Sequence, residues 1–228
     1  MAGPLIAGPA AVKPETALDI NNLARPHPPD EIMEITGSNL FLPARELMSW
    51  IDWAYLDEDG PLFTEDHDHL PMGEIACLWT NAEYISKGRK IIGQADKPGA
   101  GNSWTSARSA YQLEAWFGYA PPFLITLDAL ACAGMDNASF AALVDHELYH
   151  CAQATDRFGS PAFDDATGKP RYCMKGHDVE EFVGVVRRFG VEAAGERATD
   201  LVIAASQEPE IAPAELARSC GTCLRLVA

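Results

Sequence analysis

The stretch Ala141-Ala-Leu-Val-Asp-His146-Glu147-Leu-Tyr-His150-Cys151 contains the pattern His-Glu-x-x-His inside an apolar run that favours a helix. Residues four apart lie one above the other on a helix, so His146 and His150 point to the same side, close enough to bind one metal ion. Zinc is the default metal for such a pair. Glu147 lies about 100° round the helix, where it can reach a metal-bound water as a general base. The pattern is typical of a zinc metallopeptidase.

The helix that carries this motif is predicted to bury Glu147 as well as its apolar residues. Helical periodicity places Glu147 between Leu143 and Cys151, on the apolar stripe rather than on the solvated face. A carboxylate in that position costs free energy unless it is used. Asp136-Asn137 offers an N-cap and Gly159 a stop, which predicts a helix over residues 138–157.

The segments around the motif predict a small α+β domain. Apolar residues recur at intervals of three and four over residues 42–55, which predicts an amphipathic helix. Residues 96–110 are polar and rich in Gly and Ser, and predict a loop. Apolar runs predict three strands, the first two as a hairpin, at residues 74–80, 90–95 and 123–128. The expected fold is α+β and zincin-like, with a small mixed sheet packed on the catalytic helix and on a following helix that carries a ligand.

The strand expected just before the catalytic helix is a possible substrate site. In a zincin the strand over the metal is a sheet edge to which an extended peptide can add, and Leu124, Ile125 and Thr126 are the residues expected to do this here. Residues 159–176 predict a long loop over the site. Tyr172, on that loop, is the residue proposed to stabilise the oxyanion.

Two further groups of metal-binding residue types have simpler explanations. The stretch Glu65-Asp-His67-Asp-His69 alternates carboxylates and imidazoles, but charged residues at this spacing predict a solvated loop. Cys220 and Cys223 form one Cys-x-x-Cys pair, and a zinc ribbon needs two more ligands, which do not follow in this sequence. Neither group is therefore expected to hold the catalytic metal.

A catalytic zinc needs a third protein ligand besides the histidine pair. The metzincin continuation would need a glycine at position 153 and a ligand at 156, but the chain has Gln153 there, which disfavours Asp156. A carboxylate from the next helix is a second option, supplied by Glu180 or Glu181. His177 is the third option and the one we favour, because the glycine before it lets the chain turn the imidazole toward the metal.

The composition excludes some classes of protein and predicts the compartment. Seventeen basic and 33 acidic residues among 228 leave a formal charge of −16, which argues against nucleic acid or anionic membranes as partners. The chain lacks a long apolar run and a recognisable signal peptide, so a cytoplasmic location is expected. We predict a flexible Pro/Ala/Gly-rich arm, one metallopeptidase domain and a C-terminal helix or tail, at residues 1–29, 30–205 and 206–228.

Several motifs in chain order resemble those of the putative phage metallopeptidase family, distant relatives of SprT-type zincins. They are Gly88-Arg-Lys-Ile-Ile-Gly-Gln-Ala95, Phe123-Leu-Ile-Thr-Leu-Asp128, the His-Glu-x-x-His helix and Gly176-His-Asp-Val-Glu-Glu-Phe182. The resemblance implies His146, His150 and His177 as zinc ligands, Glu147 as general base, and a protein or peptide substrate. The alternative function is a zinc-stabilised protein-binding module without catalysis, such as a phage protein that binds a host factor.

Overall fold

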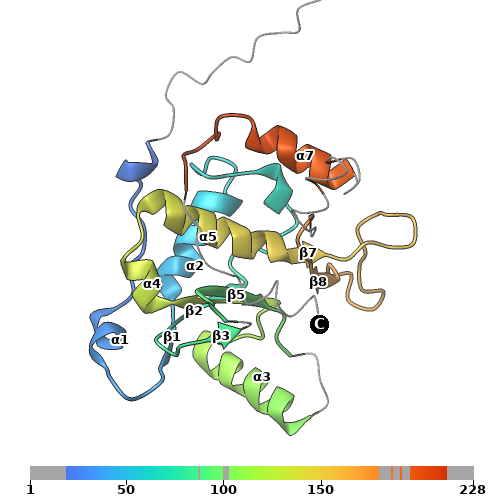
Figure 1. Cartoon of the computed structure of the whole chain (residues 1–228). Helices are drawn as coiled ribbons and strands as arrows, with labels where there is room; N and C mark the ends of the chain where they lie inside the picture. The colour runs from blue at the N-terminus through green and yellow to red at the C-terminus, as the bar shows by residue number, and fades with distance from the viewer. Residues whose placement is uncertain are drawn as a thin grey trace, which may run out of the picture.

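The computed structural model describes residues 19–86, 88–99, 103–179, 186, 191 and 196–214. A four-stranded mixed sheet forms the centre of this part of the chain, with helix α5 on one face and helix α3 on the other (Figure 1). The expected α+β class with a small mixed sheet is therefore confirmed. In spatial order the strands are β1 (Phe41–Pro43), β2 (Ile75–Thr80), β6 (Phe123–Asp128) and β5 (Gly93–Asp96), and the helices are α5 (Asn137–His150) and α3 (Trp104–Phe117).

The strand order differs from the predicted hairpin of the first two apolar runs, residues 74–80 and 90–95. β2 pairs antiparallel with β1 and parallel with β6, and β5 pairs antiparallel with β6. β2 and β5 are thus separated by β6, which comes later in the chain. A short hairpin of β3 (Ile85–Ser86) and β4 (Arg89–Lys90) connects them instead. The hairpin prediction was wrong because turn residues between two strands do not show that a strand from later in the chain, here β6, will lie between them.

Alternate residues of β6 serve the two faces of the sheet, as a strand's period of two requires. Ile125 and its neighbours of the same parity are buried in the main core with α5. Leu124 faces the opposite side, where it packs with a second cluster that includes Leu113 and Phe117 of α3. The polar segment before α3 had predicted a loop to residue 110, but the helix begins at Trp104, with Ser103 accepting a hydrogen bond from the Ser106 amide as its N-cap.

The first amphipathic helix is present, with its predicted face buried. It consists of α2 (Arg45–Ile51) and a π-helical turn, η2 (Asp52–Leu56). Four of the apolar residues that recur at this spacing, Leu47, Trp50, Ile51 and Ala54, are buried. Trp50 contacts the Phe140 ring of α5 at 5.5 Å between centroids. The helix thus supports the metal-motif helix from behind.

Helix α5 begins as predicted and ends earlier. Asp136 is the N-cap and accepts a hydrogen bond from the Ser139 amide. The helix ends at His150 rather than near Arg157, because residues from Cys151 onward join a two-stranded ribbon of β7 (Cys151–Gln153) and β8 (Tyr172–Met174). Much of the predicted long loop is therefore the outer part of this ribbon, as Figure 1 shows.

The segment ahead of the domain is ordered closer to the N-terminus than predicted. A 3-10 turn, η1 (Ile20–Asn22), lies against α5 with the Ile20 side chain buried. Asn137 donates hydrogen bonds from Nδ2 to the carbonyls of Ile20 and Leu23, and Arg25 lies over the Phe140 ring. The predicted arm does not reach residue 29, and residues 1–18 lie outside the described residues.

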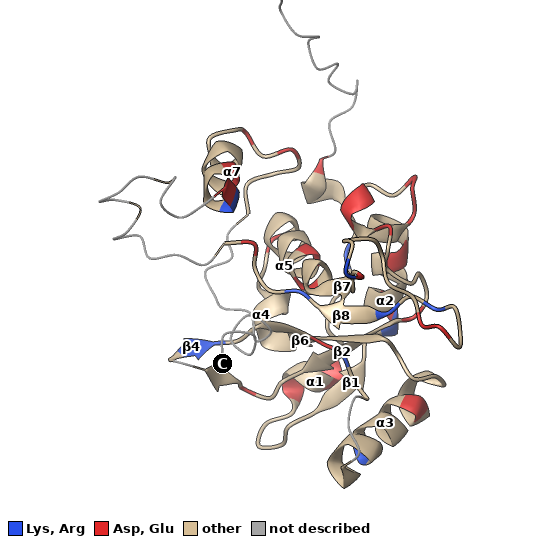
Figure 2. Cartoon of the chain, turned by 90° about the vertical axis from the view of Figure 1, so that its right-hand side faces the viewer, with Lys and Arg blue, Asp and Glu red and all other residues tan. Residues whose placement is uncertain are grey.

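The remaining helices are short or lie at the periphery. They are α1 (Asp30–Glu34), α4 (Ala129–Ala133) and α7 (Glu196–Ala205). Acidic side chains are spread over α1, α3, α5 and α7 (Figure 2). None of the described helices is long and apolar enough to cross a membrane. Cys77, Cys132 and Cys151 are buried free thiols, as expected from their apolar contexts.

Candidate metal centre

Three histidines meet beside the C-terminal half of α5. One ring nitrogen from each of His146, His150 and His177 lies within 4.8 Å of the others. The Nε2 atoms of His146 and His177 are 3.4 Å apart. Tetrahedral zinc with Zn–N bonds of 2.0–2.1 Å places its ligand nitrogens about 3.3 Å apart. The spacing therefore fits one ion held by three imidazoles.

The β7–β8 ribbon brings the third histidine to the helix. The Lys175 amide, just after β8, donates a hydrogen bond to the His150 carbonyl at 2.9 Å. The Lys175 carbonyl lies 2.7 Å from Nδ1 of His150 and so accepts its proton. This bond fixes the ring orientation and leaves Nε2 for a metal, a common arrangement for ligating histidines. His177 follows two residues later, so the same ribbon end orients one ligand and supplies another.

Burial favours the neutral form of the two histidines of α5. Burial, with smaller contributions from His150 and His177, lowers the pKa of His146 to about 4. Burial also lowers the pKa of His150. A neutral imidazole is the form that binds metal, because a protonated ring has no lone pair to donate.

Glu147 is fully buried beneath the terminal strand of the described sheet, on the apolar stripe where helical periodicity placed it. Gly93 of β5 makes this position possible. A Cβ atom at Gly93 would lie 2.7 Å from Oε1 of Glu147 and 2.9 Å from Cδ1 of Leu143. The absence of a side chain at Gly93 therefore leaves the space that the Glu147 carboxylate occupies.

A Gly93→Ala substitution is expected to displace the Glu147 carboxylate. The added methyl overpacks the contact, and we expect a loss of about 1–3 kcal/mol in the free energy of unfolding, measured by urea titration. Because the sequence predicts Glu147 as the general base of a peptidase, we also expect at least a tenfold loss of peptide hydrolysis with the metal retained. Gly134→Ala is the matched control, because a Cβ there would approach no atom closer than 3.8 Å. Equal stability and activity of the two variants would contradict the role of Gly93.

The segment at residues 65–69 packs its two histidines against the metal helix, whereas its three carboxylates are exposed, as the prediction of a solvated segment requires. His67 is 2% exposed, and its Nε2 lies 2.8 Å from Oδ1 of Asp145, the residue before His146. Tyr149 donates a hydrogen bond from its hydroxyl to Oδ2 of Asp66 at 2.6 Å. Two side chains of α5 are thus held from one neighbouring segment, and His67 lies outside the three-histidine group.

His69 completes this support at the end of the helix. Its Nε2 lies 2.7 Å from the carbonyl oxygen of Cys151, so the ring donates a proton to that carbonyl. The bond satisfies a carbonyl just past the last turn of α5, a position where helices leave acceptors without internal partners. Sequence reasoning missed this role, because a ring nitrogen bonded to a distant backbone atom leaves no local pattern.

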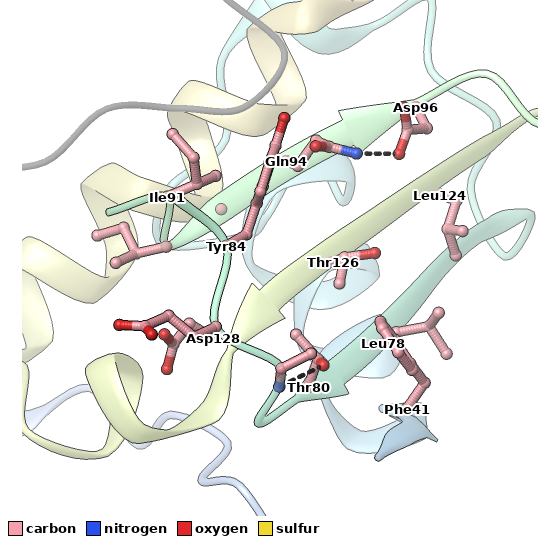
Figure 3. A pocket seen from close by; sticks show the side chains of 14 residues that line it. Phe41, Leu78, Thr80, Tyr84, Ile91, Gln94, Asp96, Leu124, Thr126 and Asp128 are labelled. Atoms are coloured by element: carbon pink, nitrogen blue, oxygen red, sulfur yellow. Dashed lines mark hydrogen bonds between the residues drawn. The ribbon is translucent and has the colours of Figure 1, made fainter. Parts of the chain in front are cut away.

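The strand predicted to bind substrate does not form a sheet edge. β6 is hydrogen-bonded on both sides, to β2 and to β5, so Leu124, Ile125 and Thr126 have no free strand edge to offer a peptide. Ile125 is in the core beneath α5. Leu124 and Thr126 line a cavity of about 470 Å³ on the opposite face of the sheet (Figure 3). The prediction is therefore wrong, and the terminal strand on this side is β5.

Tyr172, the proposed oxyanion stabiliser, is not among the residues that line the cavity at the three histidines. It is on β8, and its ring packs against Phe123 at 5.0 Å between centroids. The aromatic residue that lines the cavity at the three histidines is Tyr149. The metzincin alternative, Asp156, instead accepts hydrogen bonds from the Phe158 and Ser160 amides in the ribbon loop. The other predicted positions, Glu180, Glu181, Cys220 and Cys223, lie outside the described residues.

Comparison with known proteins assigns the chain to a family. The family model described as "Putative phage metallopeptidase" matches residues 48–206, and the chain belongs to this family. The match spans the metal-motif helix, the ribbon and His177. Comparisons with curated proteins and with solved structures found no match. The family name implies a metal ion and a protein or peptide substrate.

Proposed function

We propose that this protein is a zinc-dependent peptidase with Glu147 as general base and His146, His150 and His177 as the metal ligands. The observation that carries the proposal is the convergence of three imidazole nitrogens within 4.8 Å of one another, with a fully buried carboxylate next to one of them on the same helix. Three nitrogen ligands leave a coordination position for water or substrate, which is the usual arrangement of catalytic zinc.

The proposed mechanism divides the chemistry between the metal and the chain. Zinc in this site would supply a Lewis acid that acidifies the attacking water and polarises the scissile carbonyl. Glu147 accepts the proton of that water and delivers it to the leaving amine. Its burial beneath β5 limits solvation, which strengthens its interaction with positive charge. The Lys175 carbonyl holds the His150 ring in one orientation.

A zinc-stabilised binding module is the competing function, and it requires a closed site. Structural zinc sites have four protein ligands. Among the described residues, the candidate group contains three. The number of protein ligands on the bound metal therefore separates a peptidase from a binding module.

X-ray absorption spectroscopy on the zinc-loaded, full-length protein tests the proposal together with a proteomic cleavage screen. If the protein is a peptidase, the spectrum should show zinc bound by three histidine nitrogens and one oxygen atom from water. Cleavage should stop when a chelator removes the zinc and return when zinc is added back. Four protein ligands together with no zinc-dependent cleavage would overturn the proposed function in favour of the binding module.

A further inference from the structure

A second cavity lies along the flank of α5, next to the cavity of the three histidines. It has a volume of about 430 Å³ and shares one wall, Tyr149, with the cavity of the three histidines. Pockets of about 300–1,000 Å³ are of the size that receives ligands. The walls come from α5, from residues 62–64 and from residues 209–214. Sequence reasoning assigned no role to these three segments together.

Small residues on α5 create the space. Ala138, Ala141 and Ala142 line the cavity. Ala142 lies four residues before His146, so helical periodicity places it on the metal side of α5, one turn away. A group bound beside Ala142 therefore lies next to the proposed reaction centre, and the protein core does not separate the two.

The opposite walls favour an apolar occupant. Leu62, Phe63 and Ile211 contribute aliphatic and aromatic surface. Two carboxylates, Asp145 and Glu210, also line the cavity, but Asp145 is already paired with His67 at 2.8 Å. A cation would have to compete with that pairing, and Glu210 is exposed, where water and salt screen its attraction for a cation. An apolar group gains from leaving water.

Tyr149 is the wall between the two cavities, and its position is fixed. Its hydroxyl is hydrogen-bonded to Asp66, and its ring lies 4.7 Å from the His67 ring, edge to face. A tyrosine held at both its ring and its hydroxyl forms a rigid wall. The shape of the flank cavity is therefore set independently of any ligand.

We infer that this flank cavity is the subsite for a large apolar side chain of the substrate, such as leucine, methionine or phenylalanine, adjacent to the bond that is cleaved. The inference rests on the proposed peptidase function and adds the class of side chain that the enzyme selects. Ala142 is its specificity-determining residue, because its small size leaves room for the substrate side chain on the turn of α5 that precedes His146.

Binding of peptide hydroxamates tests the subsite without any need for turnover. Three compounds that differ only in the residue next to the hydroxamate, glycine, leucine or lysine, are titrated into the zinc-loaded, full-length protein by calorimetry. We expect the leucine compound to bind about 10- to 100-fold more tightly than the glycine compound, as burial of one leucine side chain allows. In Ala142→Phe that ratio should fall to within about threefold, because the added ring fills the cavity.

Controls separate filling of the cavity from damage to the fold. Ala107→Phe makes the same change at an exposed position of α3 and should keep the leucine preference. Ala138→Leu fills the cavity from one turn further along α5 and should also reduce the preference, which covers the case in which Ala142→Phe does not fold. In both filling variants, zinc content should match the wild type, which shows that the fold around the metal is kept.

The outcomes distinguish the subsite from the proposed function. Equal affinities for the glycine and leucine compounds, tightest binding of the lysine compound, absence of binding by all three, or a leucine preference that survives both filling variants would each overturn the subsite. A leucine preference lost on filling, in a protein that cleaves no peptide, would support the subsite and refute the peptidase.

Discussion

Glu147→Gln is expected to leave zinc bound and to reduce peptide hydrolysis by about 10³-fold. The reason is that glutamine has nearly the same shape as glutamate but cannot accept the proton of the attacking water, and general-base catalysis contributes about 10²–10⁴ in rate. The Glu147 side chain is fully buried, so bulk water does not readily replace the lost base. The rate is measured on a peptide from the cleavage screen, with zinc per chain determined by elemental analysis.

The control for this variant is Glu114→Gln, which makes the same change at an exposed position of α3. It should retain both zinc and hydrolysis. Unchanged zinc content together with unchanged hydrolysis in Glu147→Gln would show that the general-base assignment is wrong. A loss of zinc in the same variant would indicate that the carboxylate supports the metal site rather than the proton transfer.

His177→Ala is expected to weaken zinc binding by on the order of 100-fold or more, with hydrolysis falling to background. The His177 ring lies 5.1 Å from His146 and 5.3 Å from His150 between centroids, so its removal takes away one of three proposed ligands. If three ligands share about 10 kcal/mol of binding free energy, the loss of one removes about a third. Competition with a chromogenic chelator measures the change in affinity.

Two further variants, one of a histidine and one of a glutamate, test whether the loss of zinc is specific to His177. His27→Ala removes an exposed histidine far along the chain from the motif and should not alter zinc affinity. Glu181→Ala tests the alternative ligand and should retain zinc, because Asp178 and Glu181 have the spacing of a capping box, which predicts that Glu181 stabilises the start of the following helix. The reverse order, with zinc lost in Glu181→Ala and kept in His177→Ala, would identify the glutamate as the third ligand.

Features that depend on residues close in sequence were predicted well. The N-cap at Asp136, the buried stripe of α5 and the burial of Glu147 within it all follow from helical periodicity. The strands at 75–80 and 123–128 were recognisable as apolar runs. The end of α5 could not be predicted in this way. The residues after His150 take their conformation from pairing with β8, which lies about twenty positions later in the chain.

The sequence by itself determined that one helix carries His146, Glu147 and His150 at neighbouring angles, because these angles depend only on helical geometry. Tertiary structure alone decided that β6 lies inside the sheet, that Gly93 faces Glu147, and that the segment at His67 supports α5. It also brought His177 to within reach of the histidine pair by means of the β7–β8 ribbon. Each of these depends on which distant segments pack together, and the pattern of nearby residues does not encode that choice.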